Sequence, residues 1–245
     1  MPRRFCLTLI IALLWLPATH AAQAKQRVHV GYYEFPPYSY TDAHGQPSGS
    51  GLELTARLLE QAGYQAEFRS LPGARLYNDL RDGSVHLWPG APGKTELSVH
   101  TLETRHTLGE IILNLYFRPG TPPPHLPEDL RGKGVILISG YSYWQTINQW
   151  LVDPALGITQ HRTSNHDAAL EMLQRRRADY LLNYQTPVEQ AKQRLGIDEL
   201  PYVQLQRVPL KLIVSRLAPN AEALRDALDH AYEELAASGE KLQLP

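Results

Sequence analysis

Residues 28–63 read VHVGYYEFPPYSYTDAHGQPSGSGLELTARLLEQAG, an alternating apolar strand followed by an aromatic and proline-rich turn and then by a helix. Apolar residues between Leu52 and Ala62 fall on one helical face, and Gly63 is expected to end the helix. A strand, a loop and a helix in this order are typical of α/β folds, which bind ligands where the strands end and the loops lead into helices. The aromatic turn therefore lies at a position where such folds place their sites.

Strands and helices alternate along the rest of the chain, so the sheet is expected to be largely parallel. Residues 118–132, RPGTPPPHLPEDLRG, are too rich in proline for a helix or a central strand and mark a boundary between two blocks. The first block is predicted to contain strands at 66–69, 85–88 and 110–117 and a helix at 74–81. The second is predicted to contain strands at 135–138, 158–162 and 178–182 and helices at 143–151 and 167–176. Another long strand at 208–216 and a closing helix at 220–237 are predicted to follow.

Two such blocks with one final helix left over predict an α/β protein of two lobes joined by two crossings. The first lobe is expected to comprise residues 25–115 with 209–245, and the second residues 120–205. The crossings are expected around 112–117 and 208–215, with the ligand bound in the cleft between the lobes.

The N-terminus predicts export from the cytoplasm. Arg3 and Arg4 precede an apolar run, and Ala22-Gln23-Ala24 is a small-x-small cleavage site, so residues 1–24 are interpreted as a secretory signal peptide. We expect a periplasmic protein. Cys6 is the only cysteine and lies inside this segment, so the mature chain needs a packed core rather than disulfide bonds.

The composition excludes several classes of function. A formal net charge of −1 argues against a nucleic-acid partner, which needs a basic face. The histidines lack the spacing of a zinc site, and no nucleotide-binding or hydrolase motif occurs, so neither a metal, a cofactor nor a catalytic residue is predicted. A monomer is expected.

Four segments together resemble the bacterial extracellular solute-binding proteins of family 3, the periplasmic receptors of polar amino-acid uptake. They are the opening stretch and the segments ARLYNDLRDGSVHLWPG, LPEDLRGKGVILISGYSYW and NHDAALEMLQRRRADYLLNYQTP. The resemblance implies a type II periplasmic binding protein fold with a hinge and an interlobe cleft. It also implies a small polar or aromatic solute, captured for an inner-membrane ABC transporter or a sensor.

The sequence departs from the family pattern where the resemblance would place the two charged partners of an amino acid. Leu97 stands where the family has the arginine that pairs with the α-carboxylate, and Asn183 where it often has the acid that pairs with the ammonium group. An ordinary α-amino acid is therefore an unexpected ligand. Glu53 in place of aspartate is a milder change.

The resemblance and the loop positions together give a set of candidate ligand-binding residues. Phe35 corresponds to the family's stacking aromatic, although a turn with locally packed rings would look the same. Trp88 could equally be a core residue, and Arg75 could be either a substitute anion partner or a solvated helix residue. Gly140 to Ser142 could form an anion site at a helix N-terminus or simply a cap. The full set is Tyr33, Glu34, Phe35, Tyr38, Arg75, Trp88, Gly90, Ala91, Tyr141, Ser142 and Asn183.

Two other functions remain open. The family includes a cyclohexadienyl dehydratase branch, and an enzyme of that kind would need a carboxylate in the cleft, for which Glu34 is the nearest candidate. A ligand-free protein that signals by docking to a partner would also explain the two missing charged partners.

Overall fold

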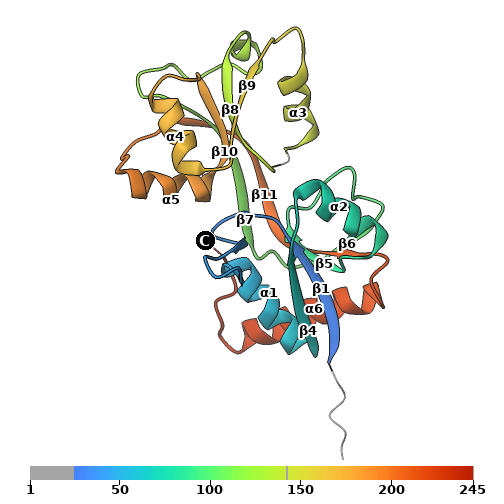
Figure 1. Ribbon diagram of the computed structural model, residues 1–245. Coiled ribbons are helices and arrows are strands. Elements are labelled where there is room, and N and C mark those ends of the chain that lie inside the picture. Colours follow the sequence, from blue (N-terminus) through green and yellow to red (C-terminus); the bar gives the residue numbers. More distant parts are fainter. Residues whose placement is uncertain (1–24, 142, 245) are drawn as a thin grey trace, which may run out of the picture.

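The computed structural model describes residues 25–141 and 143–244; the predicted signal peptide and Ser142 lie outside the described residues. Its helices and strands form two groups, connected by the two long strands β7 (Gly109–Phe117) and β11 (Tyr202–Ser215), which run side by side through the middle of the molecule (Figure 1). We call the two groups the first and second lobes. The exact boundaries given above remain a prediction.

The first lobe is built on three parallel strands with helices packed around them. The aromatic turn leads from β1 through a short hairpin, β2 and β3, into α1, and α6 packs against α1, β6 and β11. Its elements are β1 (Gln26–Tyr32), β2 (Tyr40–Thr41), β3 (Pro47–Ser48), α1 (Ser50–Gln61), β4 (Tyr64–Ser70), α2 (Gly73–Asp82), β5 (Leu87–Gly90), β6 (Thr101–Glu103) and α6 (Ala221–Ala237).

The second lobe repeats this plan with α4 and α5 packed together beside its strands. A separate aliphatic core lies there, including Ile136, Leu170 and Leu181, all fully buried. Its elements are a 3-10 helix (Glu128–Leu130), β8 (Gly134–Ile138), α3 (Gln145–Val152), β9 (Thr159–Thr163), α4 (His166–Gln174), β10 (Tyr180–Tyr184) and α5 (Gln185–Leu195).

Within the described residues nine strands form one sheet that continues through both lobes, in the order β4-β1-β5-β11-β7-β10-β8-β9, with β6 paired to β11. In this sheet β1 pairs in parallel with β4 and β5, and β8 with β9 and β10, as the alternating pattern predicts. The pairs of β11 with β5, β6 and β7, and of β10 with β7, are antiparallel. The parallel sheet of each lobe is therefore closed by an antiparallel crossing.

Several element boundaries differ from the sequence prediction. The strand expected at 85–88 is β5 at Leu87–Gly90, and the strand expected at 208–216 begins at Tyr202. Helix α5 was not predicted, because its sequence QTPVEQAKQRL buries only Pro187, Val188 and Ala191 and shows little apolar periodicity. None of the described helices is long and apolar enough to cross a bilayer.

Candidate functional site

The aromatic turn after β1 is fixed by its own backbone. The carbonyl oxygens of Pro37 and Tyr38 accept hydrogen bonds from the first N–H groups of α1, those of Ser50 and Gly51. These N–H groups have no partner within a helix, so the turn acts as the cap of α1. Gly49 makes this approach possible, since its φ is +116° and a Cβ there would lie 2.6 Å from the Tyr38 carbonyl oxygen. The backbone thus faces the helix and leaves the rings free to face the second lobe.

Rings from both lobes meet in the cleft. Phe35 packs edge-to-face on Tyr184 with ring centroids 5.0 Å apart, and lies 5.5 Å from Tyr141 and 5.7 Å from Tyr38. Tyr33 lies 6.4 Å from Tyr141. These separations are those of favourable aromatic pairs. The sequence-predicted residues Tyr33, Phe35, Tyr38 and Tyr141 are therefore brought together, with Phe35 at the centre.

Trp88 lies behind Tyr33 at 5.9 Å and is 2 % exposed. It packs in a first-lobe cluster with Tyr77 and Leu97. A Cβ on Gly90 would lie 2.1 Å from the indole ring, so the glycine is required by Trp88 itself rather than by an approaching ligand. Trp88 is therefore a core residue, and it also supports the Tyr33 ring in the cleft. The sequence left the core role and a place near the site open as alternatives.

The middle of the cleft is almost filled by these side chains. The cavity lined by Tyr33, Phe35 and Trp88, together with Ile111 of β7 and Leu210 of β11, has a volume of only about 10 Å³. The lobes are also joined by a hydrogen bond of 3.0 Å between the hydroxyl groups of Tyr38 and Thr186. A solute bound here would have to replace ring contacts that the two lobes now make with each other.

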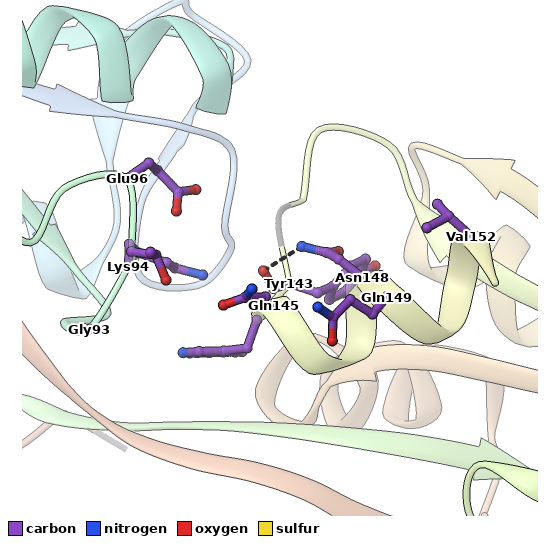
Figure 2. Close-up of a pocket in the computed structure, with 10 residues that line it drawn as sticks. Gly93, Lys94, Glu96, Tyr143, Gln145, Asn148, Gln149 and Val152 are labelled. Carbon is purple, nitrogen blue, oxygen red and sulfur yellow. Dashed lines mark hydrogen bonds between the residues drawn. The ribbon is translucent and has the colours of Figure 1, made fainter.

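A larger cavity of about 420 Å³ opens beside this cluster, between the loop after β5 and helix α3 (Figure 2). Lys94 lies in that loop and is only 6 % exposed, with its ammonium group 4.1 Å above the centroid of the Trp144 ring. Burial lowers the pKa of Lys94 to about 8. No salt bridge to Lys94 occurs among the described residues, and the nearest charge that supports its ammonium form is that of Glu96. Figure 2 shows the amine directed across the cavity toward Gln145 and the start of α3.

Glu34 lies at the edge of the cleft and is exposed. Its carboxylate accepts hydrogen bonds from the backbone N–H and the hydroxyl of Thr41 at 3.0 and 2.8 Å, and from the Ser70 hydroxyl at 3.1 Å. It lines a surface pocket of about 280 Å³ together with Gly140. These bonds hold the carboxylate in place as an acceptor.

The remaining predicted residues have other surroundings. The Arg75 guanidinium is 2.6 Å from the buried Asp79 carboxylate, and the side chain is mostly exposed. Asn183 is fully buried behind the cleft. Ala91 is 5 % exposed and belongs to the main core. Ser142 lies outside the described residues.

Sequence reasoning missed Lys94, Trp144, His166 and Tyr184. Two of them stand beside residues that were singled out: Tyr184 follows Asn183 at the end of β10, and Lys94 is three residues before Leu97. The signal that could have found Lys94 is its position directly after Gly93 in the loop that follows a buried strand.

Comparison with known proteins supports the fold. The model of the bacterial extracellular solute-binding proteins, family 3, matches residues 28–97. An ancestral arginine-binding protein bound to arginine is 20% identical, with a TM-score of 0.69 over 89% of this chain and 95% of that one. A histidine kinase sensor domain with similarity to periplasmic binding proteins is 23% identical, with a TM-score of 0.68 over 88% of this chain and 92% of that one.

An ancestral amino acid-binding protein described as a precursor of cyclohexadienyl dehydratase is 17% identical, with a TM-score of 0.65 over 87% of this chain and 90% of that one. No curated protein sequence matches the chain. The structural likenesses are too distant in sequence to carry more than the fold. The chain is therefore similar to the bacterial extracellular solute-binding proteins, family 3, over residues 28–97, and it shares the fold of periplasmic binding proteins over most of its length.

Proposed function

We propose that this protein is a periplasmic receptor that closes its two lobes on a small aromatic acid lacking an α-ammonium group and presents it to an inner-membrane permease or sensor. The observation that carries the proposal is the cluster of rings from both lobes around Phe35. A flat ring can take the place of one aromatic partner in such a cluster while keeping the edge-to-face contacts. Closure is then driven by the contacts that the solute makes with both lobes.

The charge of the cleft favours an acidic group on the solute. Lys94 carries a buried ammonium group whose closest described partner is the Trp144 ring, and a cation–π contact only partly replaces lost hydration. An anion in the adjoining cavity would supply the missing charge-assisted hydrogen bond. The N-terminal residues of α3 line the same cavity, and the N-terminus of a helix favours an anion.

The same cleft offers little to the ammonium group of an amino acid. Asn183 holds a neutral carboxamide where the family often has an acid, and its amide is already bonded within the second lobe. Leu97 packs against Trp88 and Tyr77, so the family's arginine position is part of the core. A desolvated ammonium group without an acceptor costs several kcal/mol, on the order of the whole affinity of a small ligand.

Calorimetric titration with three matched probes tests this proposal. 3-Phenylpropanoate carries the ring and the carboxylate, phenylalanine adds the ammonium group, and 2-phenylethylamine carries the ammonium group alone. We expect 3-phenylpropanoate to bind at least about tenfold more tightly than phenylalanine, a difference of about 1.4 kcal/mol. Tightest binding of phenylalanine, or micromolar binding of any of the twenty common amino acids, would contradict the proposal.

A dehydratase remains the second candidate on this scaffold, because Glu34 offers a fixed carboxylate near Tyr141. Its carboxylate oxygens already accept three hydrogen bonds from Thr41 and Ser70, so the geometry favours binding over catalysis. Incubating the protein with a cyclohexadienyl acid and measuring the dehydrated product distinguishes a dehydratase from a binding protein. Turnover abolished by Glu34→Gln would establish the enzyme instead.

A further inference from the structure

Three polar side chains form a continuous hydrogen-bonded chain behind the second-lobe face of the cleft. The amide nitrogen of Asn183, at the end of β10, lies 3.0 Å from Nδ1 of His166, the first residue of α4. Nε2 of His166 lies 3.2 Å from the hydroxyl oxygen of Tyr141. Since the Tyr141 ring packs against Phe35, this chain leads from the buried end of a strand to the ring cluster.

The direction of every hydrogen bond in this chain follows from its buried end. The carboxamide of Asn183 ends in an oxygen and a nitrogen. The backbone nitrogen of Tyr184 lies 2.8 Å from one of these two atoms. A backbone N–H can only donate, so that atom is the oxygen and the NH₂ group faces His166. Nδ1 of His166 must therefore accept, and the neutral imidazole carries its proton on Nε2.

His166 stays neutral at pH 7. Burial, and to a lesser extent the nearby Arg194 charge, lower its pKa to about 4. A second ring proton on Nδ1 would also face the Asn183 amide hydrogens. Nε2–H therefore donates to the Tyr141 oxygen.

The Tyr141 hydroxyl consequently has one hydrogen left to donate. Burial raises the pKa of Tyr141, so this proton stays on the oxygen. Within the described residues His166 is the only hydrogen-bond partner of this hydroxyl, and it occupies the oxygen as a donor. The hydroxyl hydrogen of Tyr141 must therefore bond to an acceptor that is not one of these three side chains.

We propose that Asn183 and His166 are positioning residues that orient the Tyr141 hydroxyl as a hydrogen-bond donor into the cleft, so that a bound solute must present an acceptor oxygen to it. This inference rests on the proposed function and narrows the solute class. The Lys94 ammonium group, on the first lobe, can also only donate. Both lobes then offer donors, which fits an aromatic acid with a carboxylate or a carbonyl oxygen and excludes an aromatic amine.

Asn183→Asp is the most direct test, because it changes one atom and reverses the polarity of the first bond. A carboxylate accepts from Tyr184 N–H and from His166, so a proton must move onto Nδ1. Nitrogen NMR of histidine-labelled protein at pH 7 should show His166 protonated on Nε2 alone in the native protein and on Nδ1 in the variant. A native His166 carrying a proton on Nδ1, or a variant identical to the native protein, would overturn the inference.

Binding supplies the second arm. Tyr141→Phe keeps the ring and removes the donor, so its affinity for 3-phenylpropanoate should fall roughly tenfold, the scale of one hydrogen bond to a charged group. Tyr202→Phe is the matched control on an exposed ring of β11 and should bind as the native protein does. Equal affinity in both variants would overturn the role of Tyr141.

The two arms separate the inference from the function on which it rests. The NMR measurement needs no solute, so an Nε2 proton combined with no binding of any probe would uphold the hydrogen-bond directions and reject the proposed function. Tighter binding of 2-phenylethylamine than of 3-phenylpropanoate would overturn the acceptor-bearing solute class.

Discussion

The two faces of the cleft present rings that are held in different ways. On the first lobe, Trp88 is packed by Tyr77, Leu97 and the bare backbone of Gly90, and it supports Tyr33. On the second lobe, Tyr141 is bonded through His166 to Asn183. Packing fixes where a ring lies, whereas a hydrogen-bond chain also fixes which way its polar group points.

This difference determines what each face tolerates. A packed face is sensitive to volume and to buried charge, and it is nearly insensitive to pH. A hydrogen-bonded face is sensitive to protonation and to single-atom changes that leave volume unaltered. The largest effects are therefore expected from substitutions in the packed face.

Replacing Leu97 by arginine should be the most damaging change. Leu97 is 2 % exposed among Trp88 and Tyr77, so Leu97→Arg buries a charge without a partner and should lower the free energy of unfolding by about 3 to 5 kcal/mol. Leu217→Arg, on a residue that is 64 % exposed, should change it by less than about 0.5 kcal/mol. Urea unfolding followed by circular dichroism measures both. A fully stable Leu97→Arg variant that binds an amino acid would show that the position opens onto the cleft.

Phe35→Ala should act mainly on binding. It removes the ring that both lobes contact, and the affinity for 3-phenylpropanoate should fall by roughly 1 to 3 kcal/mol, the scale of burying one large apolar side chain. Phe68→Ala in β4 is the control, because it trims a ring outside the cluster and should leave affinity unchanged. If Phe35→Ala instead unfolds the protein without a specific loss of affinity, the aromatic turn is core packing.

Lys94→Met should lower the affinity for 3-phenylpropanoate by about 1.4 kcal/mol, or tenfold, while preserving the apolar stem above Trp144. The native protein should also lose affinity as the pH rises through about 8, because Lys94 then loses its proton. Lys133→Met, on an exposed residue, should keep the native pH profile. A pH-independent native affinity would exclude Lys94 from the site.

His166 should affect stability only at acidic pH, and the effect has a defined sign. Its pKa is about 4 in the folded protein against 6.5 for the free group, so the unfolded chain binds more protons between these values. Stability should therefore fall as the pH drops from about 6.5 to about 4, by on the order of 2 to 3 kcal/mol. His166→Gln should lose this part of the dependence, and the difference between the two unfolding curves isolates it from the carboxylates. Identical pH dependence in both proteins would contradict a buried neutral His166.

Most of the fold could be predicted because apolar periodicity marks the buried faces of the strands and helices, and the α/β order then limits their arrangement. Helix α5 was not predicted because it buries so few apolar side chains. It also contains Pro187, and a helix tolerates proline only in its first turn. Residues 202–207 escaped because they precede the apolar half of β11 and are partly exposed.

The site could be predicted only in its local part. Proline and aromatic residues between a strand and a helix pointed to the turn at Phe35, but its contact with Tyr184 joins residues far apart in the sequence, as does the bond between Tyr38 and Thr186. The burial of Lys94 has no sequence signal either, because lysine is normally exposed and here the second lobe covers it. Such groups are recognisable only when both lobes are in place.

The paired strands β7 and β11 have a consequence for the order in which the cleft would come apart. If the lobes swing about this ribbon, the displacement of each contact grows with its distance from the ribbon, as along a lever. The ring cluster borders Ile111 and Leu210 of the two strands, whereas the cavity beside Lys94 has no lining residue from either. A small rotation would therefore separate Lys94 from Trp144 while the rings around Phe35 still touch, so that an arriving acid would meet the lysine before the aromatic pocket has fully opened.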